Sequence, residues 1–133
     1  MTTAAELHKA MFDAIQQRDF EALRRLFGSG SVHVSGDGAE KRGPEPVIAE
    51  VRIFTTAFPD LTVTIRRQHV PDDNVSVIEY SFSGTHHRDL EGLAPTRKPI
   101  SMVACSVLEA QGGTIRREAD YFDAATLLAQ LGQ

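Results

Sequence analysis

The chain has 133 residues, a formal net charge of −4 at pH 7 and a single cysteine, Cys105. This length suits one domain with a sizeable core. The acidic balance, with no basic stripe, argues against a nucleic-acid partner, and one cysteine excludes both an internal disulfide and a cysteine metal cage. Charged residues interrupt each apolar run before it reaches the length of a membrane span, and the N-terminal residues lack a secretory-signal pattern. We therefore expect one cytoplasmic domain over residues 1–133, with no nucleic-acid or membrane partner.

The first half of the chain predicts three helices and one short strand. Apolar residues recur at helical spacing from Leu7 to Ile15. Asp19 can cap a second, shorter helix. Residues 32–34 are typical of a short strand, and a third helix is expected over residues 45–58, where apolar residues again fall three or four apart.

In the second half the apolar period changes to two, which is the period of strands with one covered face. The expected strands span residues 61–66, 75–85, 100–108 and 114–122. A short helix over residues 124–131 closes the chain, with Asp123 as its N-cap. Helices followed by an antiparallel sheet predict an α+β domain, in which the helices cover one face of a strongly curved sheet.

Five short stretches stand at the ends of these elements. They are Val32-His33-Val34, Ala57-Phe58-Pro59-Asp60-Leu61, Gly84-Thr85-His86, Gly92-Leu93-Ala94-Pro95-Thr96, and Asp120-Tyr121-Phe122-Asp123 with the following Leu127-Leu128-Ala129-Gln130-Leu131-Gly132. In this order they resemble the SnoaL-like polyketide cyclase family of the nuclear-transport-factor-2-like fold, and the resemblance covers nearly the whole chain. It implies a cone-shaped α+β domain, whose curved antiparallel sheet wraps around N-terminal helices and encloses a pocket.

The resemblance also implies an activity. Cyclases of this family close the last ring of an aromatic polyketide by a cofactor-free intramolecular aldol condensation, and an aspartate on the last strand is the general acid/base. The matching position here is Asp120. The family often has His two residues earlier and Trp between them, whereas this chain has Glu118 and Ala119. These departures suggest a different or larger ligand beside the last strand.

Alternation along the last strand places Arg116, Glu118, Asp120 and Phe122 on one face. If this face lines a pocket, burial and a like-charged neighbour raise the pKa of a carboxyl, while Arg116 lowers it. One carboxyl can then hold a proton near neutral pH. We therefore predict Asp120 as the acid/base, tuned by Glu118 and Arg116. The alternative is an Arg116–Glu118 ion pair at the rim, with Asp120 capping the following helix.

Further residues are predicted to bind the substrate. The polar ones are His33, His86 and Ser106, and the aromatic ones are Phe54, Phe58, Tyr80, Phe82 and Phe122. His33 can equally be a half-buried histidine that only hydrogen-bonds a neighbour, and the aromatic set can be ordinary core. We expect no metal site, because His86 and the adjacent His87 point in opposite directions on an extended segment. We also expect no cofactor.

Three functions remain open from the sequence. The first is a cofactor-free cyclase or isomerase acting on a hydrophobic, polyketide-like or steroid-like carbonyl compound. The second is an epoxide hydrolase, which in related folds uses an Asp-Arg-Asp set around one water, although only Arg116 and Asp120 are evident here. The third is a ligand-binding or dimerisation module without catalysis.

The fold also implies a homodimer through the outer face of the sheet. Val63, Ile65 or Val77 is expected to supply the apolar patch for that contact.

Overall fold

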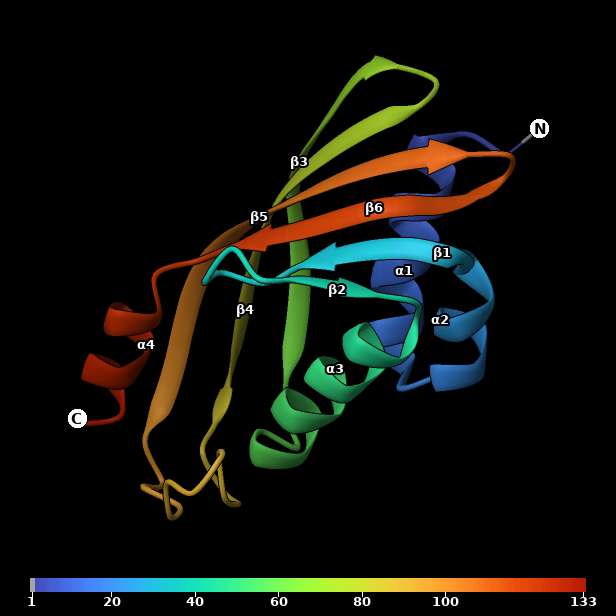
Figure 1. Cartoon of the computed structure of the whole chain (residues 1–133). Helices are drawn as coiled ribbons and strands as arrows, with labels where there is room; N and C mark the ends of the chain where they lie inside the picture. Colours follow the sequence, from blue (N-terminus) through green and yellow to red (C-terminus); the bar gives the residue numbers. More distant parts are fainter. Residues whose placement is uncertain (1) are drawn as a thin grey trace.

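Three helices from the first half of the chain lie inside the curve of a six-stranded sheet (Figure 1). The computed structural model describes residues 2–133. The helices are α1 (Ala4–Gln17), α2 (Phe20–Leu26), α3 (Glu45–Ala57) and the C-terminal α4 (Ala124–Gln130). The strands are β1 (Phe27–Val34), β2 (Glu40–Arg42), β3 (Thr62–Asp72), β4 (Val75–Thr85), β5 (Pro99–Gln111) and β6 (Thr114–Tyr121). The predicted α+β class is confirmed.

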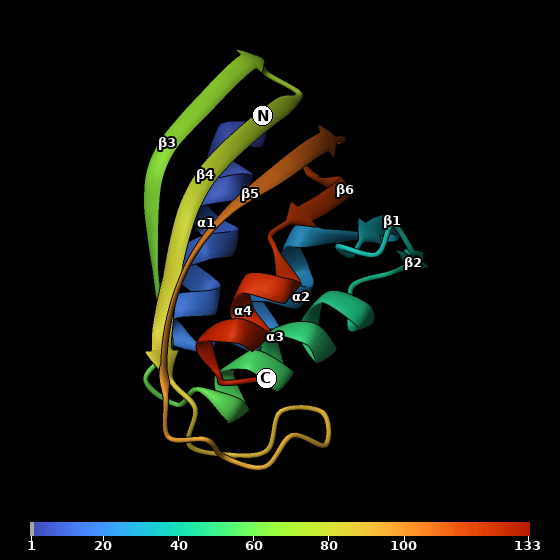
Figure 2. The same ribbon diagram turned by 90° about the vertical axis from the view of Figure 1, so that its left-hand side faces the viewer.

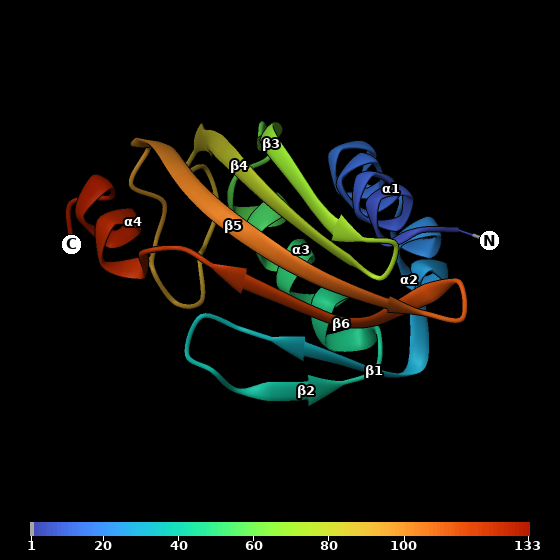
Figure 3. The same cartoon turned by 90° about the horizontal axis from the view of Figure 1, so that it is seen from above.

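The sheet has the order β2-β1-β6-β5-β4-β3. Strands β3 to β6 pair antiparallel, as predicted, but β1 pairs parallel to β6 and makes the sheet mixed. No hairpin joins β1 to β6, so no local turn dictates an antiparallel direction. Figure 3 shows β1 and β2 at the edge of the sheet beside β6. The sequence did not predict β2, because its three exposed charged residues show no alternation.

Local signals in the sequence set the ends of the helices. The side chain of Thr3 caps α1 and forms a reciprocal capping box with Glu6. At the other end Arg18 has φ 57°, and its guanidinium donates to the carbonyl of Leu61 (2.9 Å). This contact ties α1 to the chain segment after α3. Asp123 caps α4 through bonds from two backbone N–H groups, which confirms its predicted role. Within residues 2–133, no helix has the length and apolar character needed to cross a membrane.

The core consists of two apolar clusters that meet at a seam. One cluster surrounds α1 and includes Leu7, Met11, Phe12, Leu23, Ile78 and Ile115. The other surrounds the end of α3 and the base of α4, and includes Phe58, Leu61, Phe82, Met102 and Leu127. Val63 and Tyr80 are only partly buried and pack against both clusters. The seam between the clusters is where the pocket described below lies.

The outer face of the sheet differs from our expectation. Val63 lines the pocket on the inner face, so its predicted place on the outer face is wrong. Ile65 lies two residues further along the same strand and therefore shares the inner side, where it is 37% exposed near the sheet edge. Val77 is half-buried. The large apolar side chains that the outer face does expose include Val103 (77%) and Tyr121 (49%).

Candidate functional site

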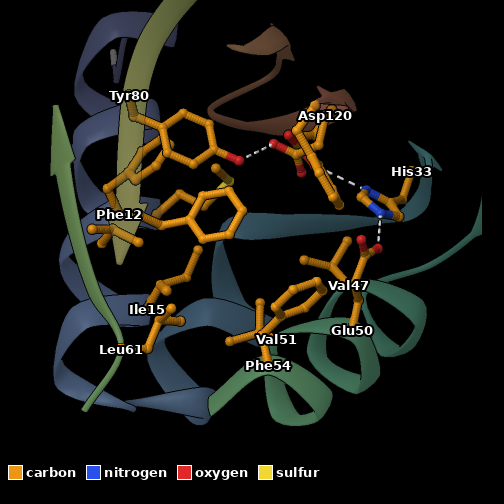
Figure 4. Close-up of a pocket in the computed structure, with 15 residues that line it drawn as sticks. Phe12, Ile15, His33, Val47, Glu50, Val51, Phe54, Leu61, Tyr80 and Asp120 are labelled. Atoms are coloured by element: carbon orange, nitrogen blue, oxygen red, sulfur yellow. Dashed lines mark hydrogen bonds and ion pairs between the residues drawn. The ribbon is translucent and has the colours of Figure 1, made fainter. Parts of the chain in front are cut away.

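A pocket lies between the inner face of the sheet and helices α1 and α3 (Figure 4). Figure 2 shows these two helices on the same side of the sheet. Most of its lining is apolar or aromatic: Met11, Phe12, Ile15, Val47, Val51, Phe54, Leu61, Val63, Phe82 and Phe122. Five polar side chains complete it: His33, Glu50, Tyr80, Glu118 and Asp120. Figure 4 shows Tyr80 facing Asp120 on one side of this polar end, and His33 with Glu50 on the other. The site is therefore an apolar chamber with one polar end.

Strand β6 supplies two carboxyl groups to this polar end. Glu118 and Asp120 are two residues apart, so the pleat of the strand turns both toward the pocket. The Glu118 side chain is fully buried, Asp120 is half-buried, and an oxygen of each carboxyl lies within 4.8 Å of the other. The phenol of Tyr80 on β4 donates to Asp120 Oδ1 (3.0 Å).

His33 lies between two carboxylates. Its Nδ1 is 2.9 Å from Glu118 Oε1, and its Nε2 is 2.7 Å from Glu50 Oε2. The parallel register of β1 on β6 sets His33 directly opposite Glu118, while Glu50 reaches it from α3. Burial by itself would lower the pKa of His33, but the hydrogen bonds to Glu118 and Glu50 outweigh burial and raise that pKa to about 10. At neutral pH His33 is therefore an imidazolium, and both ring nitrogens donate.

The pKa values of the two carboxyls of β6 are shifted in opposite directions. Burial, reinforced by the negative charge of Glu118, raises the pKa of Asp120 well above its ordinary value. Burial acts on Glu118 in the same direction, but hydrogen bonds from His33 and Asp120 outweigh it and lower the pKa of Glu118. Burial also raises the pKa of Tyr80, which keeps the phenol protonated. Of the two carboxyls, Asp120 is therefore the one that keeps its proton to the higher pH.

The same residues can be considered as metal ligands. His33, Glu118 and Asp120 offer ligand atoms that all lie within 4.8 Å of one another. A histidine ligates a metal through an unprotonated ring nitrogen, however, and both nitrogens of His33 already donate to carboxylates. Metal binding would have to replace one of these hydrogen bonds. The geometry therefore fits proton sharing without rearrangement, and metal binding only with one.

The pocket brings together seven of the residues predicted from the sequence. They are His33, Phe54, Tyr80, Phe82, Glu118, Asp120 and Phe122. The antiparallel pairing of β5 with β6 also sets Ser106 opposite Asp120.

Arg116 does not belong to this group, and its predicted place in the pocket is wrong. The pairing of β5 with β6 shifts register between Glu109 and Ala110, which interrupts the simple alternation along β6. The Arg116 side chain is 52% exposed and pairs with Glu109 at the surface. The described residues that line the pocket include no arginine.

Three other predicted substrate contacts lie outside the pocket lining. His86 is fully buried under the loop that follows β4, where the N–H of Thr96 donates to its Nδ1 (3.1 Å). Phe58 is fully buried against His86, with ring centroids 5.5 Å apart, and is core. Ser106 lies behind the pocket wall, where its hydroxyl donates to Glu118 Oε2 (2.7 Å). Ser106 therefore binds a carboxylate of the site and does not contact the space where a ligand would lie.

Sequence reasoning missed Glu50 and His8. Glu50 stands three residues after Val47 and four before Phe54, so a carboxylate at an apolar position of α3 was a usable signal. His8 is fully buried on the pocket side of α1, four residues before Phe12. His8 could have been found by the same signal, because it is also a polar residue at an apolar position of the helical period.

Comparison with known proteins places this geometry in a family. No curated protein matches the sequence. Among solved structures, IdmH from Streptomyces antibioticus, a candidate polyketide cyclase, superposes with TM-score 0.83 at 24% identity over 98% of this chain and 99% of IdmH. AclR from Streptomyces galilaeus, a candidate hydroxylase, gives TM-score 0.84 at 22% identity over 97% and 95% of the two chains.

An LEH-like epoxide hydrolase from M. tuberculosis gives TM-score 0.73 at 20% identity, covering 96% of this chain and 88% of the hydrolase. At these identities the likeness establishes a shared fold, which hosts several chemistries. The sequence profile of SnoaL-like polyketide cyclases, in contrast, matches residues 5–131. The chain belongs to the SnoaL-like polyketide cyclase family.

Proposed function

We propose that this protein is a cofactor-independent enzyme that cyclises or isomerises a hydrophobic carbonyl compound, with Asp120 as general acid/base. The observation that carries the proposal is the Asp120–Glu118 pair at the polar end of an apolar pocket, where the pKa of Asp120 is raised and that of Glu118 is lowered. Groups with proton affinities near the working pH are the ones suited to proton transfer. Membership of the cyclase family supports a small-molecule substrate.

Each polar group has a role in this chemistry. Ring closure by an aldol reaction removes a proton from the carbon beside one carbonyl and adds a proton to the oxygen of another. A carboxyl pair that shares one proton can accept the first and supply the second, so no external acid or base is consumed. Asp120, which faces the pocket, exchanges protons with the substrate, while Tyr80 orients it. The His33 cation compensates the charges of Glu118 and Glu50.

The shape of the site favours an extended substrate. A second hollow adjoins the pocket and shares Glu50, Phe54 and Phe122 with it. Its wall is apolar toward the loop after β4 and α4, through Leu90, Leu93 and Leu127, and polar toward β2, through Asp37 and Lys41. The inner pocket has a volume of about 90 Å³ and the outer hollow about 740 Å³, so a small group of the substrate would enter the inner pocket while the rest of the molecule extends into the hollow.

Epoxide hydrolysis has less support. The Asp-Arg-Asp arrangement needs a guanidinium beside the water, and Arg116 instead pairs with Glu109 on the surface. The described lining of the pocket offers His33 as its only permanent cation, and both of its nitrogens are already occupied. Proton transfer at a carbonyl compound, in contrast, needs only the carboxyl and phenol groups that already line the pocket.

The test is deuterium exchange in D₂O at the acidic carbons of polyketide-like 1,3-dicarbonyl compounds, followed by mass spectrometry. We expect the enzyme to catalyse exchange or ring closure and Asp120→Asn to lose at least about a hundredfold in rate, the typical size of a general acid/base contribution. Asp123→Asn is the matched control, because Asp123 caps α4 away from the pocket.

Equal rates for Asp120→Asn and the wild type would refute the acid/base role. Tight binding without any exchange would instead indicate a ligand-binding module. Loss of activity on adding EDTA would point to a metal at His33, Glu118 and Asp120.

A homodimer through the outer face of the sheet is a second proposal. The exposed Val103 and Tyr121 would supply its apolar centre in place of the inward-facing Val63. A monomeric mass by light scattering at micromolar concentration would contradict it.

A further inference from the structure

A chain of hydrogen bonds runs from Glu118 away from the pocket, through the core, to strand β3. Ser106 donates to Glu118 Oε2 (2.7 Å), and His8 Nε2 lies 2.9 Å from Ser106 Oγ. On the other side of the ring, His8 Nδ1 is 2.8 Å from Ser76 Oγ, which in turn accepts from Gln68 Nε2 (3.0 Å). His8, Ser76 and Ser106 are each 0% exposed and come from three elements, α1, β4 and β5.

The far end of this chain fixes the direction of its hydrogen bonds. Gln68 Nε2 also contacts the backbone carbonyl of Ala5 (3.2 Å), and a carbonyl oxygen can only accept. The nitrogen of the Gln68 amide therefore points inward, and its second N–H donates to Ser76 Oγ. The hydroxyl hydrogen of Ser76 is then free to donate to His8 Nδ1.

The hydrogen bonds of His8 continue in the same donor-to-acceptor direction toward the pocket. Burial lowers the pKa of His8 to about 4, so the ring is neutral near pH 7 and carries one N–H. With Nδ1 accepting from Ser76, that hydrogen is on Nε2 and donates to Ser106 Oγ. The hydroxyl of Ser106 must then donate to Glu118. The reverse direction would set lone pairs of Ser106 and Glu118 against each other at 2.7 Å.

We propose that His8 is a positioning residue that, acting through Ser106, keeps Glu118 ionised and thereby leaves the shared proton on Asp120. Burying three polar side chains is costly unless each is hydrogen-bonded, and this set satisfies its members only by ending on the site carboxylate. The groups that bear on Glu118, directly or through a neighbour, are His33 on β1, Glu50 on α3, Tyr80 on β4, Ser106 on β5, Asp120 on β6 and His8 on α1. The effect of His8 on catalysis rests on the proposed function, but its effect on the ionisation of Glu118 does not.

The proposal is tested by NMR titration of the Glu δ-carboxyl carbons, with Glu118→Gln used to assign Glu118. Ser106→Ala removes the donor with little change in volume, and we expect the midpoint of Glu118 to rise by about one pH unit, the size of one hydrogen bond to a charged group. Ser101→Ala, at an exposed position on the same strand, is the matched control and should leave the midpoint unchanged.

Two substitutions of His8 separate positioning from packing. In His8→Gln the amide nitrogen can take the place of Nε2 and still donate to Ser106, so the midpoint of Glu118 should stay near its wild-type value. In His8→Asn the shorter amide reaches only toward Ser76, and the midpoint should rise as in Ser106→Ala. If His8→Asn fails to fold, Ser106→Ala and His8→Gln still decide the matter.

An unchanged Glu118 midpoint in folded Ser106→Ala would overturn the inference, as would equal shifts in His8→Gln and His8→Asn. These outcomes need no substrate and are distinct from failure of the proposed function. That failure would appear as an ordinary titration of Asp120 in the unsubstituted protein.

Discussion

The imidazole of His33 is held by Glu118 on one side and by Glu50 on the other. The sequence placed His33 on a short strand and left two interpretations open, a pocket residue or a histidine that only bonds a neighbour. Neither could be chosen, because Glu50 is 17 residues away in the chain and Glu118 is 85 away. Their meeting depends on the parallel register of β1 on β6, which no local pattern encodes.

This arrangement predicts how stability depends on pH. The pKa of His33 is raised from 6.5 to about 10 in the folded protein, so its contribution is complete below pH 6.5 and is lost as the pH rises toward 10. Relative to His33→Gln, the wild type should therefore lose unfolding free energy between pH 6.5 and 9, on the order of 3 kcal/mol in total at about 1.4 kcal/mol per pH unit. Urea unfolding of both proteins at the two pH values measures this difference. A difference that does not change with pH would show that His33 is not charged.

At the scale of the elements, periodicity predicted the helices and the four long antiparallel strands, because one face of each is covered by the core. It predicted the inward face of β6 correctly at Glu118 and Asp120, and failed at Arg116. The irregularity between Glu109 and Ala110 explains the failure, since a register shift turns the residues beyond it out of the simple alternation. Nothing in the sequence of the hairpin marks that shift.

The end of α3 is joined to β4 by a close approach at Gly84. A Cβ on Gly84 would lie 3.1 Å from both Asp60 Oδ1 and the Cβ of Phe58, whereas a Cβ on Gly30 would have no neighbour within 4 Å. We expect Gly84→Ala to lower the unfolding free energy by about 1–3 kcal/mol, as overpacking does. Gly30→Ala should be neutral or stabilise by up to about 1 kcal/mol. Thermal unfolding of the two variants compares them directly, and equal melting temperatures would contradict this account of Gly84.

At the scale of the whole molecule, the order of elements and the five family-like stretches were sufficient to predict the fold. The polar end of the site was only partly predictable, because its network draws on six elements: α1, α3, β1, β4, β5 and β6. Asp120 was predicted from the family resemblance, and Glu118 from its place on the same face of the same strand. Glu50 comes from α3 and His8 from α1, and only the assembled fold brings Glu50 to the pocket and His8 to Ser106 behind its wall.

The central claim is that Asp120 holds a proton near neutral pH beside an ionised Glu118. An NMR titration of the Asp γ-carboxyl carbons tests it most directly, with Asp120→Asn to assign the signal and the N-cap Asp123, whose pKa is lowered by its bonds to Thr126, as an internal reference. The account predicts that Asp120 titrates well above the ordinary Asp value of about 3.9 and loses its proton at a higher pH than Glu118. A midpoint at or below the ordinary value would contradict the account and leave the pocket as a binding site.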